Sequence, residues 1–86
     1  MVHVKTTSGF EMDVDESMFN DMELFECVAE VEKGHMLSLP EVVKRVTGDK
    51  KKEFYDSLRN EEGRVPVDDV MNEILDIIRQ AGGKNS

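Results

Sequence analysis

The sequence predicts an α+β fold that is mostly helical, with an N-terminal β-hairpin packed on about four short helices. At 86 residues the chain has room for one domain with one modest core. The first residues alternate apolar and polar side chains, as a half-buried strand does, and the later ones repeat apolar side chains at helical spacing. We therefore expect a single domain over residues 1–81, followed by a flexible tail over residues 82–86.

The hairpin is expected over about residues 2–14. Two alternating runs, 2–7 and 10–14, flank Ser8-Gly9, which supplies turn chemistry. This alternation directs five apolar side chains inward: Val2, Val4, Phe10, Met12 and Val14. A lone hairpin is only marginally stable in water, so helices must cover its apolar face.

The first helix is expected over about residues 20–33. Asn20 is the predicted N-cap, and Glu23 reaches back to it as in a capping box. Five apolar residues repeat behind this start and predict the buried face: Met18, Met22, Phe25, Val28 and Ala29. Three acidic residues, Glu23, Glu26 and Glu30, take the other side, and Lys33-Gly34 ends the helix.

Three further helices are expected over about residues 39–47, 49–60 and 66–81. Ser38 and Asp49 are the predicted caps of the first two, and Pro66 opens the last. The last helix has a wide apolar stripe formed by Val67, Val70, Met71, Ile74, Leu75, Ile77, Ile78 and Ala81. Most of this stripe must be core, and one edge near Ile77 is available to a partner.

Charge is distributed unevenly along the chain. Residues 1–43 contain two lysines against ten carboxylates, a net charge of −8, whereas residues 44–86 contain nine groups of each sign. Because such a surface repels phosphate backbones, we expect no direct binding of nucleic acid. A basic protein partner suits this acidic half. The alternative is that the acidic residues only keep the protein soluble.

Membrane insertion and catalysis are both disfavoured by the sequence. No apolar run approaches the ~20 residues needed to cross a bilayer, and no signal segment opens the chain, so we expect a cytoplasmic protein. Cys27 is the single cysteine, expected as a small buried side chain, and His3 and His35 lack a metal-ligand spacing with it. No nucleophile motif is present. We expect no enzyme activity, no cofactor and no metal.

Two motifs before the last helix resemble known sites. With Gly63 at the sixth position of a calcium-binding loop, Leu58 occupies the first position, where calcium needs a carboxylate, and Pro66 interrupts the backbone. A corner between two helices is therefore favoured. Asp56-Ser57-Leu58 is similar to the attachment motif of acyl carrier proteins, but here the serine lies near a helix end.

Surface lysines and methionines suggest further contacts. Lys50, Lys51 and Lys52 follow the predicted cap at Asp49, where cations oppose the helix macrodipole. Their position suggests contact with an acidic surface, such as the acidic half of a neighbouring copy, and the alternative is a solvated basic turn. Among the methionines, we expect Met18, Met22 and Met71 in the core and Met36 exposed.

Several stretches together resemble the tail assembly chaperones of long-tailed bacteriophages that infect Gram-positive bacteria. The matching stretches are Thr6-Thr7-Ser8-Gly9-Phe10 running into Asp21-Met22-Glu23-Leu24, then Phe54-Tyr55-Asp56-Ser57-Leu58-Arg59 with Glu62-Gly63-Arg64-Val65-Pro66-Val67, and the Gly-Lys-Asn-Ser end. The resemblance covers most of the chain outside residues 32–48. Their order and the chain length support the match more than any single stretch does.

This resemblance implies a non-catalytic protein of the host cytoplasm that is absent from the mature virion. Such proteins bind the tape measure protein, keep it soluble and recruit tail tube subunits. The family also makes a longer form by programmed frameshifting, and Gly82-Gly83-Lys84 or Gly83-Lys84-Asn85 can be encoded by a slippery heptamer. We expect the face of Glu23, Glu26 and Glu30, with the edge near Ile77, to contact the tape measure protein or another copy. The alternative is a small acidic interaction domain, antitoxin-like or a regulatory subunit, that covers a basic partner.

Overall fold

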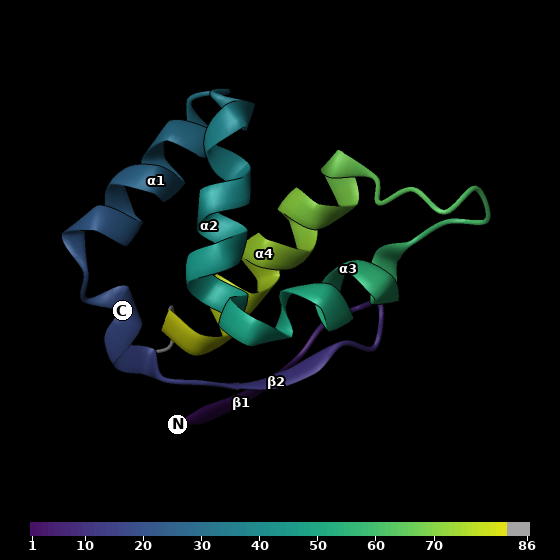
Figure 1. The fold of residues 1–86 in the computed structure, drawn as a ribbon. Coiled ribbons are helices and arrows are strands. Elements are labelled where there is room, and N and C mark those ends of the chain that lie inside the picture. Colours follow the sequence, from purple (N-terminus) through teal and green to yellow (C-terminus); the bar gives the residue numbers. More distant parts are fainter. Residues whose placement is uncertain (83–86) are drawn as a thin grey trace.

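The computed structural model describes residues 1–82 as a hairpin followed by four α-helices (Figure 1). The strands are β1 (Val2–Lys5) and β2 (Glu11–Val14), and the helices are α1 (Met22–Glu32), α2 (Leu39–Thr47), α3 (Lys51–Leu58) and α4 (Val67–Gly82). Short 3-10 helices occupy Glu16–Phe19, Met36–Ser38 and Gly48–Lys50. The predicted α+β, mostly α fold is confirmed.

The hairpin buries the face that its alternation predicts. β1 and β2 are antiparallel, with Val2 opposite Val14 and Val4 opposite Met12. Val4, Phe10, Met12 and Val14 are buried and Val2 is half-buried, so the predicted inward face is confirmed. At the turn, the Thr6 amide donates to the Phe10 carbonyl at 2.8 Å, and Gly9 adopts a φ of 94°, which glycine tolerates without strain.

The helices form a layer against one face of the hairpin (Figure 1). α1 packs on α2, α2 also contacts α3 and α4, and α4 packs on β1. Phe54 of α3 is fully buried at the centre, with its ring edge-on to Phe10 and the ring centroids 5.2 Å apart. Ile74 and Ile77 of α4 are buried against the same core. The hairpin and helices therefore share one core.

Polar side chains of α4 attach the hairpin to the helical layer. The buried Glu73 accepts a hydrogen bond from the Ser8 hydroxyl at 2.6 Å and a longer one from the Ser8 amide at 3.4 Å. The Gln80 side-chain amide donates to the Lys5 carbonyl at 2.8 Å and accepts from the Lys5 amide at 3.3 Å. Gln80 thus occupies the backbone groups of β1 that a further strand would otherwise use.

Helix starts differ from the sequence prediction at two places. Asp21, rather than Asn20, is the N-cap of α1, because its carboxylate accepts the Glu23 amide at 2.9 Å while Asn20 ends the preceding 3-10 helix. Asp49 is not the cap of α3, because it lies inside the 3-10 helix Gly48–Lys50. Ser38 precedes α2 as predicted, but its side chain makes no capping hydrogen bond.

The predicted ends of α3 and α4 also differ from the structure. α3 ends at Leu58, two residues before the expected end at residue 60. Gly82 was expected in the flexible tail, but it belongs to α4. The rest of that tail, residues 83–86 with the possible frameshift point, lies outside the described residues. Within residues 1–82, no helix has the length and apolar character to cross a membrane.

Candidate protein-binding groove

α1 presents a different face to the core from the one its spacing predicts. Leu24 and Val31 are buried, whereas Phe25 is 63% and Met22 69% exposed. The prediction that Met22 and Phe25 belong to the core is therefore wrong. The helix turns Leu24 and Val31 inward, which rotates the Met22 and Phe25 flank towards solvent and leaves Ala29 half-buried at its edge.

Three hollows adjoin one another along α4, the first two against α1 and the third against the segment 36–40 and Tyr55. The first, of about 450 Å³, is lined by Phe19, Leu24, Phe25, Val28, Ala29, Glu32, Ile78 and Gly82. The second, of about 400 Å³, is lined by Val31, Glu32, Gly34, Met36, Met71 and Leu75. The third, of about 450 Å³, is lined by Met36, Leu37, Leu39, Pro40, Tyr55, Val65, Val67 and Val70. Glu32 lines both the first and the second hollow, and Met36 lines both the second and the third, so the three hollows adjoin along α4 and are here called together the α4 groove.

One wall of the α4 groove is a single face of α4. Its lining residues are mostly three or four positions apart, the spacing of neighbours on one helix face, with one adjacent pair at 70 and 71: Val67, Val70, Met71, Leu75, Ile78 and Gly82. The opposite wall is α1, continued by the segment 34–40. Since α4 has 16 residues, the groove is about 24 Å long at 1.5 Å per residue. It matches the length of a helix of about four turns.

The apolar stripe of α4 is divided between the core and the groove. Ile74 and Ile77 point into the core, whereas Met71, Leu75 and Ile78 are half-buried at the groove. Ile77 was expected at an open edge, and that prediction is wrong because its side chain is completely buried.

The methionine predictions need partial correction. Met36, expected to be exposed, is half-buried because it packs against the core where two of the hollows meet. Met18 and Met71, expected inside, are also half-buried and pack against the core. Leu37, which lines the third hollow, is 97% exposed. The groove therefore has solvent-exposed large apolar side chains at both ends, Phe25 at one and Leu37 at the other.

The acidic residues of α1 differ in their surroundings. The Glu30 carboxylate forms a hydrogen bond with the His35 ring and lies 3.8 Å from the Lys33 ammonium. The hydrogen bond with His35 is the main cause that lowers the pKa of the Glu30 carboxyl. Glu23 and Glu26 are exposed and line none of the three hollows. Glu32 lines the α4 groove, and sequence reasoning missed this residue. Its position seven residues after Phe25, on the same helix face, is the signal that identifies it.

The three predicted lysines contact side chains of α3. Lys50 lies 3.6 Å from Glu53, and Lys52 lies 3.0 Å from Asp56. The Lys51 ammonium is 6.0 Å from the centre of the Tyr55 ring, at the outer limit of a cation–π contact. These contacts place the lysines on the surface of α3 and do not join them to the glutamates of α1.

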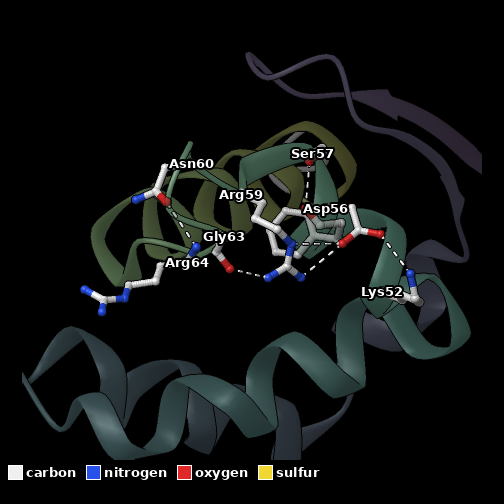
Figure 2. A network of polar contacts seen from close by, with 8 residues as sticks. Lys52, Asp56, Ser57, Arg59, Asn60, Gly63 and Arg64 are labelled. Atoms are coloured by element: carbon white, nitrogen blue, oxygen red, sulfur yellow. Dashed lines mark hydrogen bonds and ion pairs between the residues drawn. The ribbon is translucent and has the colours of Figure 1, made fainter.

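The segment between α3 and α4 is a corner held by its own side chains (Figure 2). The Arg59 guanidinium donates to the Asp56 carboxylate at 3.0 and 3.2 Å and to the Gly63 carbonyl at 2.7 Å. Lys52 contacts the other oxygen of Asp56. Lys52 and Arg59 together lower the pKa of the Asp56 carboxyl. The segment is thus a turn between helices, as the sequence indicates.

The groups that suggested calcium or carrier chemistry are engaged in this corner. The Asn60 side-chain oxygen accepts the amides of Glu62 and Arg64, both at 3.0 Å, so it closes the turn (Figure 2). The Ser57 hydroxyl donates to the Phe54 carbonyl at 2.7 Å. Both side chains therefore have structural partners in the loop and at the end of α3.

The remaining candidate ligands do not gather at one place. His3 contacts Glu11 and Asp13, each at 2.8 Å, on the outer face of the hairpin, and these hydrogen bonds raise the pKa of His3. Cys27 is a free, half-buried thiol on α1. Among residues 1–82, no group of three or more ligating side chains could hold a metal ion.

The chain matches no family model, no curated protein and no solved structure.

Proposed function

We propose that this chain is a non-catalytic protein-binding domain that acts as an assembly chaperone by holding a partner helix in the α4 groove. The observation that carries the proposal is the row of three adjoining apolar hollows along α4, together about as long as a four-turn helix. Amphipathic helices commonly bind proteins by laying an apolar face into such a groove. Exposed apolar residues at both groove ends add surface that a partner helix would cover.

The proposed partner is the tape measure protein of a long-tailed bacteriophage or prophage. The resemblance of the hairpin turn, α3 and the following corner to tail assembly chaperones supports this choice. A tape measure protein is long and helical, so it offers apolar helix faces that need cover before the tail tube encloses them. In this proposal the chain works in the host cytoplasm, recruits tail tube subunits and is left out of the mature virion.

The second candidate is an acidic interaction domain, antitoxin-like or regulatory, that covers a basic partner. The net charge of −8 over residues 1–43 favours it, and the exposed Glu23 and Glu26 form no ion pair within the described part of the chain. Gene context separates the two proposals. A tail chaperone gene can extend into a longer frameshifted product, whereas the gene of an antitoxin-like domain would lie beside its partner's gene and have no extended form.

Co-expression with the tape measure protein from the same genome tests the proposal. We expect the wild-type chain to raise the soluble fraction of that protein and to co-purify with it. Ala29→Arg places a long charged side chain in the groove and should abolish both effects. Asn72→Arg is the matched control, because Asn72 is an exposed residue of α4 outside the groove and the change adds the same charge.

Two results would count against the proposal in different ways. A tape measure protein that neither co-purifies with the wild-type chain nor gains solubility would refute the tail chaperone assignment. Co-purification that survives Ala29→Arg as well as Asn72→Arg would keep the assignment but remove the groove as the binding site.

A further inference from the structure

Glu32 occupies an unusual place in the α4 groove. It is the last residue of α1, and its side chain lines both the first and the second hollow. Among the described residues that line the three hollows, it is the only charged one. Glu32 is exposed to solvent, and half-buried apolar side chains lie on both sides of it, Val28 in the first hollow and Met36 in the second.

The carboxylate of Glu32 has no partner within residues 1–82, unlike its neighbour. Glu30 is satisfied by His35 and Lys33, whereas no hydrogen bond or ion pair reaches Glu32. Its position at the C-terminal end of α1 is also unfavourable, because the helix macrodipole places partial negative charge there and no basic residue lies in the last turn. The folded chain thus keeps an acid where local helix energetics oppose it.

From these observations we propose that the α4 groove selects an amphipathic helix with one lysine or arginine in the middle of its apolar stripe, which pairs with Glu32. This inference rests on the proposed function and specifies the chemistry of the helix that binds.

Desolvation gives the reason for this selectivity. A fully apolar helix laid in the groove would remove water from an unpaired carboxylate, and that cost opposes binding. A cation at the same position compensates for the lost water, whereas an anion adds repulsion. Glu32 therefore rejects wrong helices as well as favouring the right one. The net charge of −8 on residues 1–43 further favours the approach of a basic segment.

Synthetic peptides test the proposal with the full chain. The probes are helical peptides of about 16 residues, the length that fills the groove. They share one apolar stripe and carry lysine, norleucine or glutamate at its centre. We expect the lysine peptide to bind about tenfold more tightly than the norleucine peptide, a difference of about 1.4 kcal/mol. The glutamate peptide should bind most weakly. Fluorescence anisotropy of labelled peptides measures each Kd.

Two variants of α1 identify the residue that pairs with the peptide lysine. Glu32→Gln removes the charge in the groove and should make the lysine and norleucine peptides bind equally. Glu26→Gln makes the same chemical change on the same helix outside the groove, so it should leave the preference intact.

Each other outcome overturns the inference, and the outcomes separate it from the proposed function. The pairing of the peptide lysine with Glu32 is refuted if all three peptides bind the wild-type chain equally, or if the lysine preference survives Glu32→Gln. In either case the groove remains a binding site. If no peptide binds, the inference falls together with the groove as a helix-binding site. A tape measure protein that neither co-purifies with the wild-type chain nor gains solubility from it would refute the tail chaperone assignment independently of any peptide result.

Discussion

Phe25 allows the contribution of the groove to binding to be separated from its contribution to folding. Its side chain is 63% exposed, so only about a third of its surface leaves water when the chain folds. Burying a whole phenylalanine side chain stabilises a protein by at most about 3 kcal/mol. Phe25→Ala should therefore lower the free energy of unfolding by about 1 kcal/mol or less. For a chain of this size, 1 kcal/mol corresponds to a fall of about 4–8 °C in Tm, which is therefore the largest fall expected.

The effect of the same substitution on binding should be larger. A helix laid in the α4 groove covers the remaining surface of the Phe25 ring, and truncation of a buried aromatic anchor typically costs about 2 kcal/mol or more. We expect the Kd of the lysine-centred peptide to rise by about 30-fold. Anisotropy titration measures this change, and urea unfolding followed by circular dichroism measures the stability of the same samples.

Val46→Ala provides the matched control. Val46 is buried in α2 and does not line the groove, so its truncation should cost about 2 kcal/mol of unfolding free energy and leave the peptide Kd unchanged. The reasoning would be refuted if Phe25→Ala left the Kd unchanged. It would also be refuted if both variants weakened binding equally, because binding would then follow stability rather than contact with Phe25.

The other predictions concern the stability of the fold. Phe54→Ala should cost about 3–5 kcal/mol, measured by urea unfolding, because it empties the fully buried centre of the core; a cost below about 1 kcal/mol would contradict this packing. Ser8→Ala should cost about 1.5 kcal/mol by removing the hydroxyl that donates to Glu73, and a double-mutant cycle with Glu73→Gln should show coupling rather than additivity. His3 has a pKa raised above 6.5 by its two carboxylate partners, so its stabilising effect is complete below that pH and is lost as pH rises through the folded pKa. The difference in urea midpoint between wild type and His3→Ala should shrink from about pH 6 to about pH 8, and a constant difference would show that the His3 contacts do not affect stability.

The sequence by itself determined those elements whose local pattern permits one arrangement. In the hairpin, period-two alternation allows only one face to be apolar, and Ser8-Gly9 marks the turn, so the inward residues were predictable. Helix positions followed from the proline and glycine residues that bound them, within a few residues at each end. The exact caps were less predictable, since Asn20 and Asp21 are adjacent and both suit the position.

Only the tertiary structure decided which side of each helix faces the core. α1 has two overlapping apolar arcs, one with Met22 and Phe25 and one with Leu24 and Val31, and spacing alone cannot choose between them. Packing against the rest of the core selected the second arc and left the first at the groove. The stripe of α4 is likewise divided, with Ile77 buried and Leu75 at the groove, because two different neighbours contact it.

The residues that line the candidate site also depend on which face of α1 packs against the core. The α4 groove brings together residues 19–40, Tyr55 and residues 65–82, and no local pattern in the sequence shows that these segments lie together. Sequence reasoning therefore selected Glu23, Glu26 and Glu30 by charge alone and missed Glu32. Whether an acidic side chain of α1 faces solvent or the groove depends on how the helix is rotated about its axis, and long-range packing of the core sets that rotation.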